Sequence, residues 1–574
     1  MRLKQRHLDT RGAFGIRRRD GGGISYSQAA IRWGALVALC SALTAALHAQ
    51  APASSQTAAD ERLGLLEAVR LTLAQDPTIR LQELQTNVAR GAWQEASGQF
   101  DVTLDTTVQK GLTRTPRTEL ERFQTGVQTN ANGDLEFVST QLPGVLAEDV
   151  TNYRLGLSKQ LRSGPTLSSG VELTRFADNL DQRRAVNRAN LNFVIHVPLL
   201  KGFGRAATDA LEMAAKVRYE AEGLELHHTI TARILNTASA YWNCVSAQRQ
   251  LEILRETEAR ARDLAARVSD LIDAGEVAAS ELKQVQADLA QKTAARIAAE
   301  QRLTQARQSL ALAIGRSLKE LPTAPLPGDR FPSPPTNAAP PAFQGQAMIE
   351  QCLNRRADYQ AALKTQKAAE ILLRAARRNL KPQLDFELEV GYASLDEGSQ
   401  FRRFYGALDP RDFTGLNTMG TLRLQWPFGN NAARGQFVQR EAAEQQSVVR
   451  AQDLARSVTS GVLVALDELQ QTLAELRKAI EAAKYYREAE ENEREKLKIA
   501  ASTVIDVITI ADRRSDAELN EVSALARFAL TVARVRFETG LLVSIATAPA
   551  AVLSQEDLIT IPTAELIQSA ATKP

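Results

Sequence analysis

Gly202, Gly204 and Arg205 belong to the segment that comes nearest to a cofactor-binding motif. They follow a strand-like segment and precede a helix-like one, as the glycines of a dinucleotide-binding fingerprint do. That fingerprint also needs a second strand within about 30 residues and an acidic residue near the end of the unit. In this chain the helical pattern continues for about 70 residues instead. We therefore expect no cofactor here, and we expect the glycines to bend the chain between strand and helix.

His227 and His228 are the next candidates, in this case for a metal site. Two ligating histidines on one helix face stand four residues apart, whereas these two are adjacent and have no further ligands beside them. The chain has five histidines in all, and no nucleophile motif with a paired base occurs. We therefore expect neither a metal site nor an enzyme.

The composition indicates long helices rather than a catalytic domain. Of 574 residues, 24% are charged and only 5% aromatic, and Ala, Glu, Arg, Leu and Gln dominate two long tracts, as they do in coiled coils. The 70 basic and 67 acidic residues nearly balance. Nucleic acid is not an expected partner, because binding phosphates needs a markedly basic face.

The first 49 residues have the pattern of a secretory signal peptide. A basic region with Arg17, Arg18 and Arg19 precedes the uncharged segment 33–47 and small residues, which is the order such leaders show. Cys40 leaves lipoprotein processing open, although Leu39 stands where a small residue is preferred. No later uncharged run reaches the 18 residues of a membrane helix. Beyond the leader only Cys244 and Cys352 remain, and we expect buried thiols rather than a disulfide framework.

Short segments with a period of two predict β-strands. They are residues 100–105, 153–157, 167–173, 191–195, 384–392 and 422–426. Alternation places apolar and polar side chains on opposite faces. In a soluble sandwich the apolar face would be the core, whereas in a membrane barrel it meets lipid. Because Asp385, Glu387, Glu389 and Arg423 repeat on the other face, beside an export signal, we favour a barrel with a wet lumen.

Two tracts, 206–274 and 433–500, predict helices about 100 Å long at 1.5 Å per residue. Apolar residues in the second tract recur at spacings of four and three, which indicates a coiled-coil seam. This seam contains Val462, Leu466, Leu469, Leu473, Leu476, Ile480 and Ala483. The returning helix of the first tract has the same pattern at Leu303, Ala306, Leu310 and Ala313.

The order of helix, strands and long helical hairpin occurs twice. Glu281 lies 34 residues before Gly315, and Asp506 lies 34 residues before Gly540, which indicates a true duplication. We expect a signal peptide at 1–49, a first repeat at 60–316 (strands 100–198, hairpin 206–315) and a Pro-rich linker at 317–345. A second repeat at 346–541 (strands 383–427, hairpin 433–540) and a C-terminal tail at 542–574 follow, with residues 547–574 loosely ordered.

This arrangement resembles the TolC-like outer-membrane efflux protein family. The matching motifs are Leu66-Glu67-Ala68-Val69, Asp76-Pro77, residues 198–205, Tyr241-Trp242 and residues 536–541. The resemblance implies a mainly α fold with membrane β: a homotrimer whose shared β-barrel in the outer membrane continues as an α-helical barrel in the periplasm. Physics agrees, because open sheet edges are excluded from lipid and several chains must therefore close one barrel.

One departure concerns the strands, because the family usually has two per repeat and the first repeat here has four candidates. The extra pair either enlarges the barrel or extends outside the membrane, and the sequence leaves both open. Residues 113–148 and 393–415 are expected to be long extracellular loops.

The resemblance also implies which residues line the pore and dock partners. Asp506 matches the first position of an acidic constriction ring, which would favour cations, and Asp512 is a candidate for a second ring. Thr509 and Ser502 replace the family's second aspartate and its gate arginine, which puts the rest of that gate in doubt. The expected adaptor-docking tips are Gly275, Glu276, Val277 and Ala278 in the first hairpin and Ala501, Ser502 and Thr503 in the second.

The function implied is a passive exit duct for efflux or type I secretion. Its partners would be a periplasmic adaptor (membrane fusion) protein, an inner-membrane pump reached through that adaptor, and outer-membrane lipid. Two alternatives are a periplasmic adaptor, which has one long hairpin, and a structural coiled-coil protein of the envelope. The two hairpins and the alternating strands with acidic faces count against the adaptor. The proline-terminated strand blocks and the alternation with a period of two count against the coiled-coil protein.

Overall fold

The computed structural model describes residues 62–180, 185–273, 278–321, 325–334, 345–409, 411, 413–499, 501–543 and 554–562. They belong to one compact unit that spans Glu61–Pro574. The expected signal peptide with Cys40, and the tip residues Gly275, Glu276 and Val277, lie outside the described residues. Among the described residues, no helix is both long enough and apolar enough to cross a membrane.

The first repeat contains two short helices, a break and a very long hairpin. Its helices are α2 (Leu65–Gln75), α3 (Pro77–Ser97), α4 (Arg205–Thr208), α5 (Ala210–Asp273) and α6 (Ala279–Ile314). Asp76 separates the first two, because its carboxylate accepts hydrogen bonds from the backbone N–H of Thr78 (2.7 Å) and Ile79 (3.3 Å), and Pro77 suits the first helical position. At 64 residues, α5 is about 96 Å long, as predicted.

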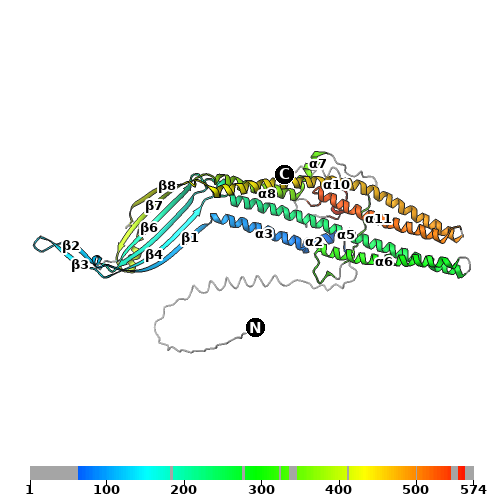
Figure 1. The fold of residues 1–574 in the computed structure, drawn as a ribbon, viewed down its shortest axis with the longest axis horizontal. Coiled ribbons are helices and arrows are strands. Elements are labelled where there is room, and N and C mark those ends of the chain that lie inside the picture. Colours follow the sequence, from blue (N-terminus) through cyan, green and yellow to red (C-terminus); the bar gives the residue numbers. More distant parts are fainter. Residues whose placement is uncertain are drawn as a thin grey trace, which may run out of the picture. The chain divides into compact units, whose positions relative to one another are not determined.

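The second repeat has the same order. Its helices are α7 (Gln346–Arg355), α8 (Ala357–Arg378), α10 (Asn431–Lys498) and α11 (Val504–Glu538). In Figure 1 both long hairpins run away from the strands, α5 with α6 and α10 with α11. At the strand end, α3 packs against α5, α5 against α8 and α8 against α10, so that four helices form one layer.

Six antiparallel strands form one sheet in the order β1-β4-β5-β6-β7-β8. These strands are β1 (Val102–Pro116), β4 (Val145–Gln160), β5 (Thr166–Asp178), β6 (Val186–Pro198), β7 (Gln383–Glu397) and β8 (Phe413–Gln425). Each overlaps one of the six candidates, and all are longer than predicted. A short 3-10 turn, Gly98–Phe100, joins α3 to β1. The β6–β7 pair joins the two repeats.

Both segments predicted as loops contain regular structure, which corrects that expectation. Residues 113–148 hold the ends of β1 and β4, a 3-10 turn (Leu120–Arg122) and a separate hairpin of β2 (Phe123–Thr129) and β3 (Leu135–Gln141). Residues 393–415 hold strand ends and the short helix α9 (Phe401–Gly406). Phe404 of α9 is buried against Leu173 and Ala189 of the sheet. The prediction failed because these strands continue beyond their alternating, apolar part.

The register gives the sheet one apolar face and one polar face. Residues paired across neighbouring strands share a face, and the pairs Leu104↔Leu157, Leu155↔Val171, Leu191↔Tyr392 and Phe386↔Leu422 are all apolar. Most of these side chains are exposed. The opposite face carries Asp105, Arg154, Glu172, Asn190, Glu387 and Arg423. The alternation predicted from the sequence therefore extends over all six strands.

The helical core contains most of the predicted coiled-coil seam. Val462, Leu466, Leu469, Leu473, Leu476 and Ala483 of α10 are buried, and Leu310 and Ala313 of α6 are buried as well. Ile480 is the exception in α10, with 36% of its surface exposed, and Leu303 and Ala306 of α6 are only half-buried. The free thiols of Cys244 and Cys352 are buried, as expected, and burial raises the pKa of Cys244 to about 11.

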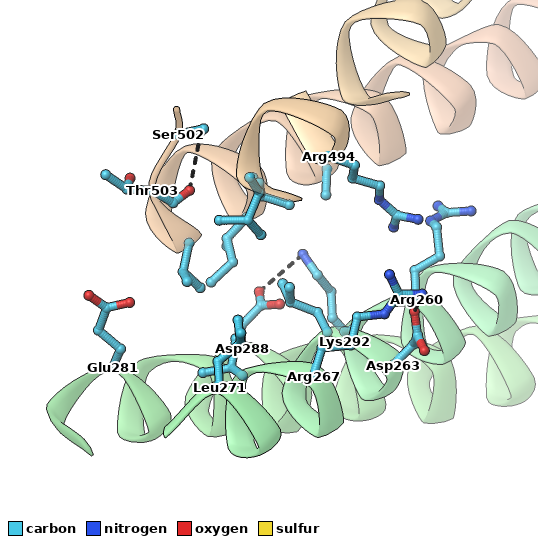
Figure 2. Close-up of a pocket in the computed structure, with 18 of the residues that line it drawn as sticks. Arg260, Asp263, Arg267, Leu271, Glu281, Asp288, Lys292, Arg494, Ser502 and Thr503 are labelled. Atoms are coloured by element: carbon cyan, nitrogen blue, oxygen red, sulfur yellow. Dashed lines mark hydrogen bonds and ion pairs between the residues drawn. The ribbon is translucent and has the colours of Figure 1, made fainter. Parts of the chain in front are cut away.

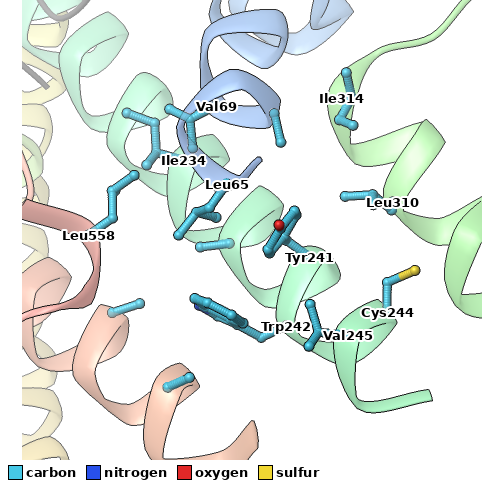
Figure 3. Packing of buried hydrophobic residues seen from close by; sticks show 14 of the residues in the cluster. Leu65, Val69, Ile234, Tyr241, Trp242, Cys244, Val245, Leu310, Ile314 and Leu558 are labelled. Carbon is cyan, nitrogen blue, oxygen red and sulfur yellow. The ribbon is translucent and has the colours of Figure 1, made fainter. Parts of the chain in front are cut away.

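A second buried cluster anchors the linker and the tail to the helices (Figure 3). Tyr241 donates its hydroxyl to the Leu63 carbonyl (2.9 Å) and accepts from the backbone N–H of Asp329 (3.1 Å). Leu558, in the short helix α13 (Glu556–Ile559), is buried in the same cluster. The described part of the tail, 554–562, is therefore packed, which corrects the expectation of a loosely ordered tail.

Two glycines end the hairpins in matching positions. Gly315 after α6 has φ +84°, and Gly540 after α11 has φ +70°. An added Cβ at Gly315 would lie 2.7 Å from the Gln75 carbonyl oxygen, and one at Gly540 would lie 2.7 Å from the Cβ of Arg355. Each glycine thus touches the end of the first short helix of its own repeat, which is the structural form of the predicted duplication.

Candidate gate between the tips of the helical hairpins

The two hairpins approach each other near their tips and enclose a cavity of about 650 Å³. In Figure 2 the end of α5 and the start of α6 form one side, and the end of α10 and the start of α11 form the other. Val268, Val285 and Val504 are buried together beside it. The expected tip residues Ser502 and Thr503 line this cavity, together with Glu281.

Capping residues define the turn from α10 to α11. Thr503 is the N-cap of α11: its hydroxyl oxygen accepts from the Asp506 backbone N–H (3.2 Å), and the Asp506 carboxylate accepts from the Thr503 backbone N–H (3.3 Å) and hydroxyl (2.7 Å). This capping box ends the turn and starts a new helix. Ser502 donates to Glu493 (2.5 Å), and the hydrogen bond from Ser502 lowers the pKa of Glu493.

Asp506 and Asp512 differ in their surroundings. Asp506 is exposed, and its carboxylate accepts hydrogen bonds from Thr503 within the turn. Asp512, with 45% of its side chain exposed, forms an ion pair with Lys292 of α6. Lys292 is mostly buried and also contacts Asp288 (3.3 Å). Asp512 thus joins the two hairpins of one chain, and the structure does not bring it together with Asp506.

The other predicted docking residues are placed as follows. Ala278 is exposed and is the N-cap of α6, and Ala501 donates its backbone N–H to the Lys496 carbonyl (2.8 Å). Both lie at the hairpin ends, where the sequence placed the tips.

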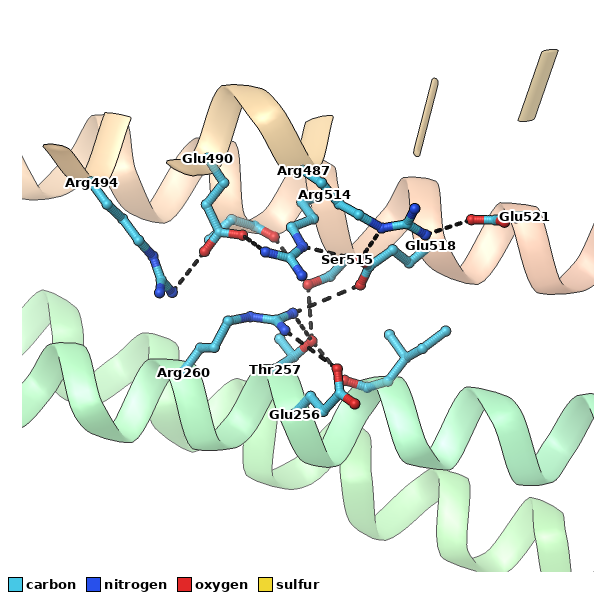
Figure 4. Close-up of polar contacts among 12 residues, drawn as sticks. Glu256, Thr257, Arg260, Arg487, Glu490, Arg494, Arg514, Ser515, Glu518 and Glu521 are labelled. Atoms are coloured by element: carbon cyan, nitrogen blue, oxygen red, sulfur yellow. Dashed lines mark hydrogen bonds and ion pairs between the residues drawn. The ribbon is translucent and has the colours of Figure 1, made fainter. Parts of the chain in front are cut away.

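A cluster of charged side chains lies next to the cavity and links α5 to α10 and α11 (Figure 4). Its centre is Glu490 of α10, whose side chain is 1% exposed and which binds Arg494 (2.7 Å) and Arg514 (2.8 Å). Glu518 of α11 binds Arg514 (3.0 Å) and Arg487 (2.9 Å). We call these five residues, with Arg260, the ionic cluster.

Arg260 of α5 connects the first hairpin to the ionic cluster. Its guanidinium lies 3.9 Å from Glu518 and donates to the Thr257 hydroxyl (2.9 Å). Thr257 in turn shares a hydrogen bond of 3.0 Å with Ser515 of α11. Burial and the neighbouring charge of Arg514 lower the pKa of Arg260. Burial alone would raise the pKa of Glu518, but hydrogen bonds from Arg487 and Arg514 outweigh it and lower that pKa.

Sequence reasoning missed the ionic cluster, although the chain contains a signal for it. The spacing of four and three that ends at Ala483 continues through Arg487, Glu490, Arg494 and Leu497. The seam of α10 therefore changes from apolar to charged as it approaches the tip. A buried charge on a coiled-coil seam needs a partner of opposite sign, and Arg514 is that partner for Glu490.

The glycine segment at 202–205 and the histidine pair at 227–228 contribute to the fold of the chain. Gly202 and Gly204 both have φ +81° and form the bend from β6 to α4, as predicted. The imidazole of His228 lies 3.6 Å from the Asp358 carboxylate, and burial lowers the pKa of His228. Among the described residues, no group of three or more His, Cys, Asp or Glu is placed to hold a metal ion.

Two kinds of comparison with known proteins give matches. One segment of the sequence matches a protein family, and the structure resembles solved structures. Residues 158–316 match the family described as outer membrane efflux protein, and no curated protein matches the chain.

Three solved structures are similar. The CmeC outer membrane channel of Campylobacter jejuni has a TM-score of 0.60 at 14% identity, covering 85% of this chain and 87% of its own. The MtrE outer membrane channel of Neisseria gonorrhoeae, in its open state, has a TM-score of 0.56 at 16% identity. The match covers 86% of this chain and 94% of MtrE. The outer membrane protein VceC of Vibrio cholerae has a TM-score of 0.56 at 14% identity. The match covers 83% of this chain and 96% of VceC.

These similarities confirm the predicted fold class, two tandem repeats of strands and long helical hairpins. Residues 158–316 thus match the outer membrane efflux protein family, and the described residues have the fold of these outer membrane channels.

Proposed function

We propose that the chain is one subunit of a trimeric outer-membrane channel that serves as a passive exit duct. It would carry substrates of an efflux or type I secretion system across the periplasm and outer membrane. As such a channel it would conduct solutes rather than act as an enzyme, in keeping with the outer membrane efflux protein family that residues 158–316 match. Its strands lie in the outer membrane and its helices extend into the periplasm.

The single observation that carries this proposal is the two-faced sheet with open edges. Its apolar face continues over six strands and remains exposed, which suits contact with lipid. Among the described residues, β1 and β8 each have a strand partner on one side only. Unpaired backbone groups are not tolerated in the hydrocarbon core. Neighbouring copies must therefore pair β8 of one chain with β1 of the next.

The helices support a tunnel that continues from the sheet. Four helices enter or leave the strand region, and they pack side by side in the order α3, α5, α8, α10. A layer of this kind has two open edges as well, at α3 and α10. The same rotation that closes the sheet would pack α10 of one copy against α3 of the next.

The tips of the hairpins are the proposed contact with the other parts of the system. A periplasmic adaptor would dock at Ala278, Ala501, Ser502 and Thr503, together with 275–277, and an inner-membrane pump would act through it. Energy would come from the pump. Asp506 would form an acidic ring at the closed end of the tunnel, because it is exposed beyond the turn that its capping box defines.

The adaptor and the coiled-coil envelope protein are weaker candidates. Neither accounts for a six-stranded sheet with an apolar and a polar face, nor for two hairpins of this length in one chain. We therefore retain them only as outcomes of the test below.

The test is membrane fractionation followed by the mass of the detergent-extracted particle. We expect recovery at outer-membrane density and a mass near three chains. Recovery from the inner membrane or the soluble fraction, as a monomer or dimer, would refute the duct and favour the adaptor or the envelope scaffold.

A further inference from the structure

Strands β4 and β5 belong to the same continuous sheet as the other four strands. β4 pairs with β1 along its whole length, residues 102–116 with 145–159. β5 pairs with β4 from Thr166 to Asp178 and with β6 from Thr166 to Phe176. A pair of strands that folded away outside the membrane would break this register, and no break occurs in it.

The two strands also continue both faces of the sheet. Tyr153, Leu155 and Leu157 of β4 are exposed on the apolar face, with 42%, 48% and 47% of their surface accessible. Arg154 of β4 and Glu172 of β5 face each other on the polar side, where Asn152 donates to Glu172 (2.7 Å). Because these residues alternate in step with β7, β4 and β5 meet the same two environments as β7 does.

The turn between β4 and β5 is fixed to the helix layer. Arg162 in that turn donates two hydrogen bonds of 2.7 Å to Glu212 in the first turn of α5. The Arg162 guanidinium also lies 4.7 Å from the centre of the Phe100 ring, at the end of α3. The turn is therefore held between α3 and α5, at the level where the other strands pass into helices.

The width of six strands matches the width of four helices. Strands in a barrel are spaced 4.7–4.9 Å apart and tilted by about 45°. Six such strands occupy about 40 Å of the circumference, whereas four occupy only about 27 Å. Four helices packed side by side at 8–10 Å occupy roughly 32–40 Å. The helix layer of this chain, α3-α5-α8-α10, thus fits a sheet of six strands better than one of four.

From these observations we infer that the complete channel has a barrel of about 18 strands whose outer pore passes solutes of about 20 Å. This inference rests on the trimer proposed above, because three subunits of six strands each give that number. Barrels of 16–18 strands enclose an aqueous channel, and barrel diameter grows roughly in proportion to strand number. The outer pore would then place little restriction on cargo size, and discrimination would fall to the tips of the hairpins.

Cysteine labelling in intact cells tests whether β4 lies in the barrel. Arg154→Cys should face the lumen and Leu155→Cys should face lipid. Glu387→Cys and Phe386→Cys on β7 are the matched pair. A charged, membrane-impermeant maleimide should react at least about tenfold faster with the lumen-facing member of each pair, because a thiol in lipid does not form the reactive thiolate.

The four variants separate failure of this inference from failure of the proposed function. If the two β7 cysteines differ in reaction rate but the two β4 cysteines react equally fast, the barrel of about 18 strands is wrong and the proposed channel is still supported. Equal reactivity within both pairs would overturn the channel itself. A contrast in both pairs supports both.

A deletion of residues 145–178 tests the pore width independently. It removes β4 and β5 and leaves β1 antiparallel to β6, because the two removed strands have opposite directions. Single-channel current in the presence of graded poly(ethylene glycol) on the loop side measures the largest polymer that enters. The diameter cut-off of the deletion variant should be smaller than that of the full chain by at least about a third, because barrel diameter falls with strand number while the lining side chains keep their size. An unchanged cut-off would contradict the inference. If the variant does not assemble, the cut-off of the full chain decides alone. Exclusion of polymers about 20 Å across by the full chain would also contradict the inference.

Discussion

Lys292 of α6 forms an ion pair with Asp512 of α11, and this contact joins the tips of the two hairpins within one chain. Lys292 and Asp288 both line the cavity between the hairpins, and their side chains are 3.3 Å apart. A part of the molecule that opens must lose contacts of this kind. The pair is therefore a suitable place to weaken the closed state.

Asp512→Asn should make the closed state less stable. Because Asp512 is half-exposed, the loss should be at most about 1 kcal/mol, or roughly a fivefold increase in the open fraction. The measurement is the open probability of single channels. Glu83→Gln removes an exposed pair on α3 and should leave the open probability unchanged. A D512N channel that opens no more often than wild type would refute a role for this pair in closure.

Glu490→Ala should destabilise the folded hairpins strongly. The substitution leaves Arg494 and Arg514 without their buried carboxylate, and breaking a buried ion pair from one side costs about 3–5 kcal/mol. Glu481→Ala is the matched control on the same helix, because Glu481 pairs with the exposed Lys478. Thermal unfolding of the purified protein compares the two. Equal melting temperatures would show that the ionic cluster does not hold α10 to α11.

Gly315→Ala and Gly540→Ala should each lower the free energy of unfolding by more than about 1 kcal/mol, because the backbone angle is strained for alanine and the Cβ overlaps the adjoining helix end. Gly223→Ala in α5 is the control: its Cβ would meet no atom within 4 Å. That change should stabilise by about 0.5–1 kcal/mol. The free energy of unfolding is measured with denaturant. If all three substitutions change it equally, Gly315 and Gly540 do not have the same special role at the ends of the two hairpins.

The ionic cluster should loosen in acid. Its arginines hold the pKa of Glu518 below the ordinary value, so the folded state binds fewer protons at this carboxyl than the unfolded state. Its stabilising contribution is then complete above about pH 4.3, the ordinary value for Glu, and is lost as pH falls through the lowered pKa. Arg487 of α10, Arg514 of α11 and Arg260 of α5 are the charges that face it.

Melting temperatures measured between pH 7 and pH 3 test this dependence. Wild type should lose stability below about pH 4.3, and Glu518→Gln, which carries no ionisable group at this position, should show a shallower fall over the same range. Parallel curves for the two proteins would exclude Glu518 as a source of acid sensitivity.

Much of the architecture could be predicted from local periodicity. The seam from Val462 to Ala483 packs at the predicted spacing except at Ile480, because a heptad pattern fixes which side of a helix meets its neighbour. The six strands could be predicted because apolar and polar residues alternate in their central parts. Their ends were missed, as were the β2–β3 hairpin and α9, because polar strand ends and turns lack that alternation.

The candidate site was harder to predict than the fold. Asp512 was considered only as a pore residue, and its partner Lys292 lies 220 positions earlier in the chain. No local pattern reports contacts between two hairpins. The charged continuation of the seam at Glu490 was visible in the sequence, but that Arg514 supplies its counter-charge depends on how α11 returns along α10.

The most direct test of the central claim is the current through single purified particles in a planar bilayer. We predict discrete conductance steps with a preference for cations, and a reduced preference in Asp506→Asn, because that substitution would remove the proposed acidic ring. A folded outer-membrane trimer that gives no steps under any applied voltage or pH would contradict the account of this protein as a channel.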